Sequence, residues 1–369
     1  MYLLEFAGED DPFAAREAAS AATGVRRIAP GVATARGVAP ERVRGLAYTH
    51  RASALLGRTD AERESARALL EATPLERTGT VAVRATDVRG SSGVDTERVE
   101  RDLGQVLVDR GFGVDLDDPD HLLRAIFSTG RLEGGSLAVD ESTGDLITSL
   151  ESTGDGETDG PRDERVSICA LGWLETESVR DFGTRAPTDK PFFQPGSMDP
   201  LLARAVANVA GAEPDRTVLD PMCGTGGILV EAGLVGADVI GTDAQAKMVD
   251  GARANLAHFL ESPALSPTGV DRGGWHVGRG DATRLPLRDG AVDGVVFDAP
   301  YGRQSKIDAH RLEDLVAGAL AEARRVASRA VVVADRSWAS EARDAGWELE
   351  AAFERRVHRS LTRYVLILS

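Results

Sequence analysis

Short apolar runs alternate with longer amphipathic stretches from residue 215 onward, which is the pattern of strands and helices that follow one another in an α/β domain. The runs are almost continuously apolar, as is typical of parallel strands covered on both faces. The predicted strands are Val218–Leu219, Val239–Thr242, Trp275–Val277, Gly294–Phe297 and Ala330–Ala334, and the predicted helices are Gly226–Leu234, Ala246–Phe259, Leu312–Val326 and Ser337–Asp344. Two long strands with no helix between them, Trp347–Val357 and Leu361–Leu368, predict a terminal antiparallel hairpin on this mostly parallel sheet.

The first half of the chain is less regular and predicts a mixed α+β arrangement. Its predicted strands are Tyr2–Phe6, Val32–Ala35, Thr80–Thr86, Leu122–Ser128 and Val166–Glu175, and its predicted helices are Pro12–Thr23, Ala61–Thr73 and Thr96–Arg110. One more helix, Leu201–Gly211, is predicted at the start of the α/β domain. Residues 140–164 contain nine acids and one arginine, so we expect an acidic flexible loop there. The expected organisation is a ferredoxin-like α/β unit at 1–47, a second domain at 48–178, a linker at 179–198 and the α/β domain at 199–369.

Charge changes this picture in one region. The 369 residues carry a net charge of −16, and lysine occurs only at positions 190, 247 and 306. This composition leads us to the hypothesis of a halophilic organism with a salt-rich cytoplasm. Residues 26–58 are the exception, since they hold seven arginines against one acid. Both a solvated surface and contact with RNA phosphates fit this stretch, and Arg26, Arg27 and Arg44 are the candidate RNA-binding residues.

Several classes of protein are disfavoured. No apolar run approaches the ~18 residues of a membrane span, and the N-terminus shows no basic region or cleavage signal, so secretion is not expected. Cys169 and Cys223 fall in different predicted domains, which makes a disulfide improbable and favours a cytoplasmic location. The six histidines show no metal-ligand spacing, so we expect no metal. We also expect a monomer.

Four short signals carry the candidate chemistry, and each places an acid just past a predicted strand. In open α/β sheets, ligands bind at these strand ends. A glycine-rich turn follows Asp220, but Leu229 stands where a dinucleotide site has its third glycine, so a ligand without phosphates fits better. Asp243 is placed to accept hydrogen bonds from ribose hydroxyls, and Asp281 from an adenine amino group. The candidate cofactor-binding residues are Asp220, Cys223, Gly224, Thr225, Gly226, Gly227, Asp243, Ala244, Gly280, Asp281, Ala282 and Asp298.

The fourth signal, Asp298-Ala299-Pro300-Tyr301, offers a carboxylate, two backbone carbonyls and an aromatic face. It resembles the [D/N/S]-P-P-Y signature of S-adenosylmethionine-dependent methyltransferases that modify exocyclic amino groups of bases, with Ala299 replacing the first proline. The resemblance implies that Asp298 and a carbonyl of Ala299 or Pro300 accept the two amino hydrogens. Tyr301 would stack on a base extruded from its helix, and Arg303 and Lys306 would contact nearby phosphate.

Two further stretches resemble known segments. Leu103-Gly104, Val114-Asp115-Leu116 and Pro119-Asp120 resemble a THUMP domain over roughly residues 48–175, which implies binding to RNA, typically the acceptor end of tRNA. Phe192 to Pro200 resembles the segment before the catalytic domain of THUMP-containing tRNA guanine N2-methyltransferases. In that family it lines the methionine side of the cofactor pocket; an aromatic lid packing two domains together is the alternative.

In domain order and motifs, the whole chain resembles the archaeal THUMP-containing tRNA guanine-10 N2-methyltransferases. This implies a Rossmann-like class I methyltransferase domain with a seven-stranded sheet, preceded by an α+β THUMP-containing region. It also implies S-adenosylmethionine as cofactor, tRNA as partner, and conversion of guanosine 10 to N2-methyl- and then N2,N2-dimethylguanosine.

Alternatives stay open. A sibling enzyme acting on guanine at another tRNA position would share every motif. A DNA or RNA adenine N6-methyltransferase would share the Asp298–Tyr301 chemistry, but would give the first 180 residues no purpose. A non-catalytic RNA-binding protein with a decayed site is the alternative from another class, with Ala299 as its only hint. A dehydrogenase is disfavoured by Leu229 and the terminal hairpin.

Overall fold

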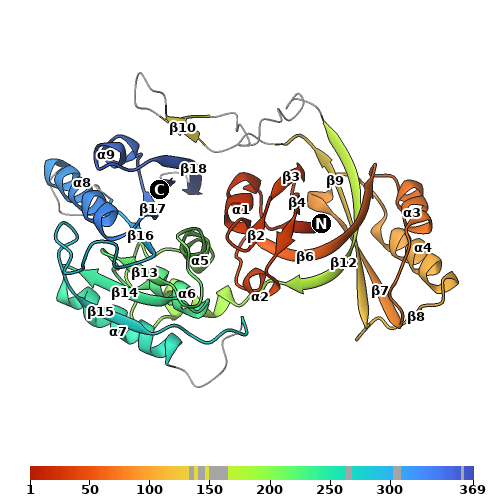
Figure 1. Cartoon of the computed structure of the whole chain (residues 1–369), viewed down its shortest axis with the longest axis horizontal. Helices are drawn as coiled ribbons and strands as arrows, with labels where there is room; N and C mark the ends of the chain where they lie inside the picture. Colours follow the sequence, from red (N-terminus) through yellow and green to blue (C-terminus); the bar gives the residue numbers. More distant parts are fainter. Residues whose placement is uncertain (133–136, 140–145, 149–164, 262–267, 302–308, 359–360) are drawn as a thin grey trace. The chain divides into compact units, whose positions relative to one another are not determined.

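The computed structural model describes residues 1–132, 137–139, 146–148, 165–261, 268–301, 309–358 and 361–369 (Figure 1). The chain forms two compact units, which are described separately. Unit 1 comprises Met1–Arg44, Tyr48–Glu133 and Ser152–Ser178, and unit 2 comprises Gly45–Ala47, Gly134–Glu151 and Val179–Ser369. Among the described residues, no helix is both long enough and apolar enough to span a bilayer.

Unit 1 is built on an eight-stranded sheet in the spatial order β3-β4-β1-β6-β12-β9-β7-β8. Neighbouring strands are antiparallel, except that β7 runs parallel to both β8 and β9. The strands of this sheet are β1 (Tyr2–Phe6), β3 (Arg26–Ala29), β4 (Val32–Ala35), β6 (Thr49–Thr59), β7 (Thr80–Asp87), β8 (Gly113–Val114), β9 (His121–Gly130) and β12 (Val166–Glu177). The remaining elements are α1 (Asp11–Ala18), α2 (Pro40–Val43), α3 (Arg63–Ala72), α4 (Thr96–Asp109), η1 (Val88–Gly90) and a two-stranded sheet of β2 (Ala22–Thr23) and β5 (Gly37–Val38).

The sheet of unit 1 buries side chains on both faces, as β9 shows. Leu123 and Phe127 belong to a core that includes residues of α3 and α4, whereas Ile126 packs in a separate cluster with Leu3. Successive side chains of a strand point to opposite faces, so one strand contributes to both cores. Cys169 lies in the first core and is fully buried, and burial raises the pKa of its thiol to about 12.

Most predicted elements of unit 1 are confirmed, with two differences. The helix expected over Pro12–Thr23 ends at Ala18, because Ala22 and Thr23 instead pair with Val38 and Gly37. Strands β2, β3, β5, β6 and β8 and the short helix α2 were not predicted, since these stretches are short or do not alternate cleanly. Strands from both sides of residue 47 share one sheet. Most of the expected segments 1–47 and 48–178 therefore lies in unit 1, although Gly45–Ala47 and Gly134–Glu151 belong to unit 2, and the division at residue 47 stays a prediction.

Unit 2 contains a nine-stranded sheet in the order β11-β10-β18-β19-β17-β16-β13-β14-β15. Its strands are β10 (Leu137–Val139), β11 (Leu146–Thr148), β13 (Thr217–Asp220), β14 (Asp238–Asp243), β15 (Trp275–Arg279), β16 (Gly294–Asp298), β17 (Ala330–Ala334), β18 (Leu349–His358) and β19 (Leu361–Leu368). Its helices are α5 (Pro200–Val209), α6 (Gly227–Leu234), α7 (Ala246–Leu260), α8 (Ala309–Val326) and α9 (Ala339–Asp344), with 3-10 turns η2 (Phe182–Arg185) and η3 (Pro187–Asp189).

The order of these strands confirms the methyltransferase arrangement expected from the sequence. Strands β13 to β17 are parallel, and β18 and β19 form the terminal antiparallel hairpin beside β17. Every residue of β17 is buried, as expected for a central strand covered on both faces. Val316 and Leu320 of α8 pack into one core. The indole Nε1 of Trp347, just before β18, donates a hydrogen bond to the Leu320 carbonyl at 3.0 Å.

Strands β10 and β11 extend the sheet beyond the predicted hairpin. β10 pairs with β18 through Leu137 and Ala352, and with β11 along its length. β11 falls within 140–164, which was expected to be a loop throughout. That part of the prediction is wrong, because the short apolar run Leu146-Ile147 interrupts the acidic residues and pairs as a strand. Residues 140–145 and 149–164 lie outside the described residues.

Candidate active site

The carboxyl ends of adjacent parallel strands bring the predicted acids to one edge of the sheet. Asp298, Asp220 and Asp243 are the last residues of β16, β13 and β14, and these strands are neighbours in that order. Asp281 follows the end of β15, the next strand of the sheet. Because parallel strands end at the same edge, these four acids lie in the region where open α/β sheets bind ligands.

The turn from β13 to α6 depends on glycine. Gly224 and Gly226 have φ angles of 50° and 75°, a left-handed conformation that glycine adopts without steric cost. Asp243 holds the turn from the neighbouring strand, because its Oδ2 accepts a hydrogen bond from the Gly224 N–H at 3.1 Å. The Cys223 N–H also donates to the Thr242 carbonyl at 2.9 Å. The backbone at Gly224 is thereby fixed beside open space.

A cavity of about 190 Å³ lies beside this turn. Asp220 and Asp298 both line it, so the ends of β13 and β16 share one hollow. Another wall is formed by the segment Gln194–Met198, and Met222 and Met248 add apolar surface. The cavity therefore joins three features that the sequence analysis singled out separately: the glycine-rich turn, the D-A-P-Y signal and the segment around Phe192 to Pro200.

Asn255 of α7 forms hydrogen bonds both to Phe192, in the segment Phe192 to Pro200, and to Thr225 in the glycine-rich turn. Its Oδ1 accepts a hydrogen bond from the Phe192 N–H at 2.9 Å, and its Nδ2 donates to the carbonyls of Phe192 at 2.9 Å and Thr225 at 2.8 Å. The Asn255 side chain is fully buried, so these bonds are shielded from water. Sequence reasoning missed Asn255, because one asparagine in an amphipathic helix carries no signal of its partners.

The electrostatics of the cavity favour a ligand that carries positive charge. Burial holds the pKa of Asp220 well above its ordinary value, and the charges of Asp243 and Asp298 raise it further. The Met222 N–H opposes this by donating to Asp220 Oδ1 at 3.0 Å. A nearby cation would stabilise the ionised form. Burial also raises the pKa of the Cys223 thiol, so this thiol stays protonated at neutral pH.

A chain of hydrogen bonds connects Asp298 to the terminal hairpin. The Tyr301 hydroxyl donates to Asp298 Oδ1 at 2.7 Å and accepts from Arg363 Nε at 2.7 Å. Arg363 Nη2 lies 3.7 Å from Asp298 Oδ2. Burial raises the pKa of Asp298 to about 6, whereas the Arg363 charge and the Tyr301 hydrogen bond lower it. Arg363 and Tyr301 thus stabilise the ionised carboxylate at the cavity wall.

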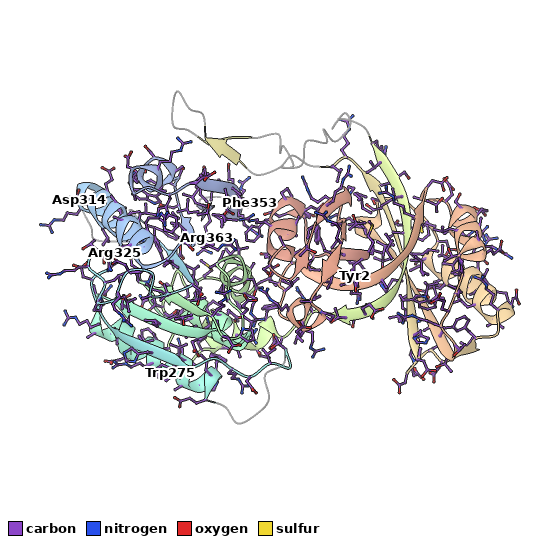
Figure 2. All side chains as sticks on the ribbon, viewed as in Figure 1. Tyr2, Trp275, Asp314, Arg325, Phe353 and Arg363 are labelled. Atoms are coloured by element: carbon purple, nitrogen blue, oxygen red, sulfur yellow. The ribbon has the colours of Figure 1, made fainter. Side chains whose placement is uncertain are left out.

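Arg363 is the second residue of the site that sequence reasoning missed. It lies on β19 and its side chain is only 6% exposed, and Figure 2 labels it among the side chains of unit 2. A charged residue just ahead of the apolar run Val365–Leu368 was a weak signal of a buried role. Nothing in the linear sequence connects it with Tyr301.

Asp243 and Asp281 lie along the same edge of the sheet, but the described cavity wall includes neither of them. Asp243 Oδ1 accepts a hydrogen bond from the Gln245 N–H at 2.8 Å. Asp281 is exposed, and its Oδ1 accepts from the Thr283 N–H at 2.9 Å and the Thr283 hydroxyl at 2.8 Å. These bonds lower the pKa of Asp281. Their expected roles toward a ribose and an adenine stay predictions.

Other candidate cofactor-binding residues have varied surroundings. Gly227, the first residue of α6, lines the cavity. The Thr225 hydroxyl lies 3.3 Å from that of Ser197. Ala244 is exposed after β14, and Gly280 donates its N–H to the Asp243 carbonyl at 3.1 Å. The side chain of Ala282 packs in the core, so only its backbone is available to a ligand.

Two of the candidate RNA-binding residues, Arg303 and Lys306, lie outside the described residues. Arg26 and Arg27 belong to β3, the edge strand of the unit 1 sheet, and Arg44 follows α2. Across the described parts of both units, no cluster of three or more histidine, cysteine or acidic side chains is arranged to hold a metal ion.

Comparisons with known proteins found related sequences and structures. The family of RMKL-like methyltransferase domains matches residues 187–365. A tRNA (guanine(10)-N2)-dimethyltransferase of Methanothermobacter thermautotrophicus is 30% identical over 332 residues, which cover 88% of this chain and 83% of that protein. One from Pyrococcus abyssi is 32% identical over 194 residues, or 51% of this chain and 55% of that protein. The crystal structure of TrmN from Thermus thermophilus covers 100% of this chain and 99% of its own, with 23% identity and a TM-score of 0.45.

Proposed function

The chain belongs to the tRNA (guanine(10)-N2)-dimethyltransferase family, and we propose that it transfers methyl groups from S-adenosylmethionine to a guanosine in tRNA. The acceptor is the exocyclic N2 amino group, at position 10, and the products are N2-methylguanosine and then N2,N2-dimethylguanosine. One observation carries this proposal: a single cavity is lined by Asp220 beside the glycine-rich turn and by Asp298 of the D-A-P-Y signal. Cofactor binding and amine activation would therefore occur in one place.

The residues of the cavity fit this cofactor. S-adenosylmethionine carries a sulfonium and an ammonium group, and when bound it supplies an electrophilic methyl group. Asp220 and Asp298 bring two acids to the cavity wall, where a positive charge would favour their ionised forms. Gly224 leaves open space where any side chain would project. Asp220 and residues 223–227 would hold the cofactor, together with Asp243, Ala244 and residues 280–282 along the sheet edge.

Asp298 would orient the acceptor amine. The N2 nitrogen of guanine is conjugated with the ring and is a weak nucleophile, so positioning matters to the reaction. Ionised Asp298 accepts one amino hydrogen, and the carbonyl of Ala299 or Pro300 accepts the other. Asp298 then takes the released proton or passes it to water. The Tyr301 hydroxyl donates a hydrogen bond to Asp298 Oδ1, and the charge of Arg363 lowers the pKa of Asp298. Both favour the ionised state that this role requires.

Tyr301 would hold the base itself. Its hydroxyl is fixed by Asp298 and Arg363, which sets the position of the ring. The Arg363 guanidinium lies 5.8 Å from the ring centroid and donates to the hydroxyl at the edge of the ring. A guanine extruded from the tRNA would stack on a face of the ring. Arg303 and Lys306 would contact phosphate close to this nucleotide.

Unit 1 would supply RNA binding through its THUMP-like region. The three candidate arginines lie in this unit, and Arg26 and Arg44 are exposed. Arginine contacts to phosphate contribute affinity without reading sequence, so they suit a surface that positions a folded tRNA. At high salt this contribution shrinks, and shape and stacking would carry more of the recognition.

The proposal also covers the oligomeric state of the protein and the salt concentration in which it works. We place it as a monomer in the salt-rich cytoplasm of a halophile, on the basis of the −16 net charge and the scarcity of lysine. Thermal unfolding across a series of KCl concentrations tests this. The hypothesis expects unfolding at low salt, and full stability in dilute buffer would contradict it.

A methylation assay tests the proposed function. Unmodified tRNA transcripts and labelled S-adenosylmethionine are incubated with the protein in high-salt buffer, and nuclease fragments are mapped by mass spectrometry. Label as N2-methylguanosine or N2,N2-dimethylguanosine at position 10 is the expected result. The same nucleosides at another position would leave the mechanism in place but change the site. Absence of label despite cofactor binding would contradict the proposed substrate.

A further inference from the structure

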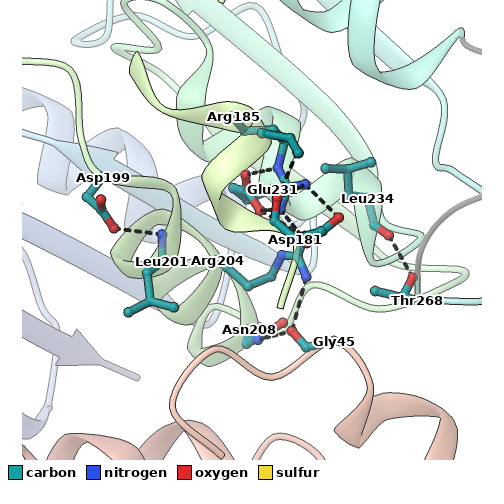
Figure 3. Close-up of polar contacts among 11 residues, drawn as sticks. Gly45, Asp181, Arg185, Asp199, Leu201, Arg204, Asn208, Glu231, Leu234 and Thr268 are labelled. Atoms are coloured by element: carbon teal, nitrogen blue, oxygen red, sulfur yellow. Dashed lines mark hydrogen bonds and ion pairs between the residues drawn. The ribbon is translucent and has the colours of Figure 1, made fainter. Parts of the chain in front are cut away.

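A buried cluster of charges lies in unit 2, around Glu231 of α6 (Figure 3). Arg185 Nε donates to Glu231 Oε1 at 2.7 Å, and Arg204 Nη2 lies 2.8 Å from Glu231 Oε2. Asp181 pairs with Arg185 at 2.7 Å. Glu231, Arg185 and Arg204 are all at most 3% exposed. The two acids and two guanidinium groups of these ion pairs balance each other.

Lys190 adds a positive charge that these pairs leave unbalanced. Its side chain is 94% buried, since only 6% is exposed, and its Nζ has no hydrogen-bond partner among the described residues. Glu231 is close enough to attract it, but both Glu231 oxygens are bound to arginines. Asp199, the other acid near Lys190, is exposed and accepts a hydrogen bond from the Leu201 N–H at the start of α5. Burying an unpaired ammonium group is costly, so a missing partner is indicated.

The position of Lys190 shows where that partner would bind. A Cβ atom added to Gly227 would lie 3.2 Å from Lys190 Nζ, so the ammonium group sits against the first residue of α6. Gly227 and Ile228 line the cavity. Burial lowers the pKa of Lys190, whereas the charge of Glu231 raises it. An anion in the cavity would therefore stabilise the charged lysine.

The start of α6 offers a second attraction for an anion. The first helical hydrogen bond runs from the Val230 N–H to the Gly226 carbonyl at 2.9 Å, so the N–H groups of Gly227, Ile228 and Leu229 precede it and lack partners within the helix. No side chain in the described part of the chain caps this end. Exposed N–H groups at a helix N-terminus favour anions, and here they adjoin the buried ammonium group of Lys190.

We propose that Lys190 and the first turn of α6 form a carboxylate subsite, which binds the α-carboxylate of the amino-acid part of the cofactor. The inference rests on the proposed function. The charges beside the cavity support it, since Asp220 and Asp298 line it and favour positive groups, whereas Lys190, whose ammonium group lies against the lining residue Gly227, favours a negative group there. A ligand with a carboxylate and a cationic centre satisfies both, whereas a neutral nucleoside satisfies neither.

The test uses three ligands and the full-length protein in buffer of constant salt. Titration calorimetry gives the dissociation constants of S-adenosylhomocysteine, its decarboxylated analogue and 5′-methylthioadenosine. Wild-type protein should bind S-adenosylhomocysteine about ten- to a hundredfold more tightly than the decarboxylated analogue, as expected for a charge-assisted contact. Equal affinity for the two would overturn the inference without any variant. Failure of the wild type to bind S-adenosylhomocysteine at all would instead contradict the proposed function.

Variants then assign the contact to Lys190. Lys190→Met should weaken S-adenosylhomocysteine binding about tenfold or more, to the level of the decarboxylated analogue, and leave 5′-methylthioadenosine within about twofold. Lys190→Arg should keep part of the preference for the carboxylate. Lys247→Met is the matched control, because Lys247 is exposed and lies over the Phe192 ring at 5.7 Å; it should change no affinity by more than about threefold. An equal loss for all three ligands in Lys190→Met would assign Lys190 a purely structural role and overturn the inference.

Discussion

Arg363 Nε lies 2.7 Å from the Tyr301 hydroxyl, although 62 positions of the chain separate the two residues. The contact exists because strands β16 and β19 both pair with β17, from opposite sides. β16 runs parallel to β17 and ends beside it, and β19 runs antiparallel to β17, so the start of β19 lies at the same edge as the end of β16. The terminal hairpin thus delivers a guanidinium group to the end of β16, where Asp298 lines the cavity. Several measurable consequences follow for the reaction and for stability.

Replacing the Asp298 carboxylate should stop catalysis and spare cofactor binding. Asp298→Asn keeps the shape of the side chain, while Asp298→Ala removes it, and both lose the charged acceptor for the amine. We expect kcat to fall about 10²-fold or more, with the dissociation constant of S-adenosylhomocysteine changed by only a few fold. Turnover that survives within a few fold of wild type would show that Asp298 does not have the assigned role.

Removing the Arg363 charge should move the pH profile of the reaction. Activity requires ionised Asp298, so it should be lost as pH falls through about 6, the pKa that burial gives this carboxyl. Arg363 lowers that pKa, and Arg363→Met should therefore shift the acid limb of kcat/KM upward by about one pH unit. Arg363→Lys keeps a charge and should shift it less. A uniform loss of activity at every pH would mean that Arg363 only supports the fold.

The same carboxylate should lower stability at neutral pH. An unfolded chain ionises Asp298 near pH 3.8, whereas the folded protein retains the proton up to about pH 6. Its stabilising contribution is therefore present below pH 4 and is lost as pH rises through 6. Relative to wild type, Asp298→Asn should gain about 2 kcal/mol in free energy of unfolding between pH 4.5 and pH 8. Chemical denaturation at both pH values measures the gain, and a pH-independent difference would contradict it.

Breaking the buried charge cluster should destabilise unit 2 strongly. Glu231→Gln leaves Arg185 and Arg204 buried without their shared carboxylate, which typically costs about 3–5 kcal/mol. Glu313→Gln is the control, because the Glu313–Arg336 pair is 49% and 45% exposed at 3.4 Å, and such pairs contribute about 0–1 kcal/mol. Urea denaturation of both variants gives the comparison. Equal effects would show that the cluster contributes no more than surface charge.

Neutralising Arg26, Arg27 and Arg44 together should weaken tRNA binding and leave S-adenosylhomocysteine binding unchanged. Each lost phosphate contact reduces the slope of log K against log salt by about 1. Binding of tRNA measured over a range of KCl concentrations would show it. Arg98→Gln with Arg101→Gln, on exposed positions of α4 in the same unit, is the control. An unchanged slope in the triple variant would make these arginines ordinary surface residues.

The strands of unit 2 were predictable because burial on both faces leaves a strong pattern in the sequence. β17, Ala330–Ala334, is apolar throughout, and its predicted bounds are those observed. β6 gave no such pattern: His50, Arg51 and Arg58 break the alternation of Thr49–Thr59, yet the strand lies inside the sheet of unit 1. There the neighbouring strands β1 and β12 decide the conformation, and they are distant in sequence.

The residues of the candidate site also fall into those that the sequence predicted and those that it did not. Asp220, Gly224 and Asp298 were found because each stands next to its own strand, where local sequence determines the geometry. Arg363 and Asn255 were missed, because their partners are 62 and 63 positions away along the chain. Which hydroxyl or carbonyl a buried polar side chain meets depends on strand order and register, and no short stretch of sequence contains that information.

The pairing of β10 with β18 changes which strand forms one edge of the unit 2 sheet. β18 is ten residues long and would otherwise present an open edge at that side of the unit 2 sheet. A long unpaired edge invites other chains to add as strands, whereas a very short outer strand discourages them. β11, with three residues, is that outer strand. Strands β10 and β11 thus protect this edge from pairing with other chains, and a fragment starting at Val179 would lose this protection.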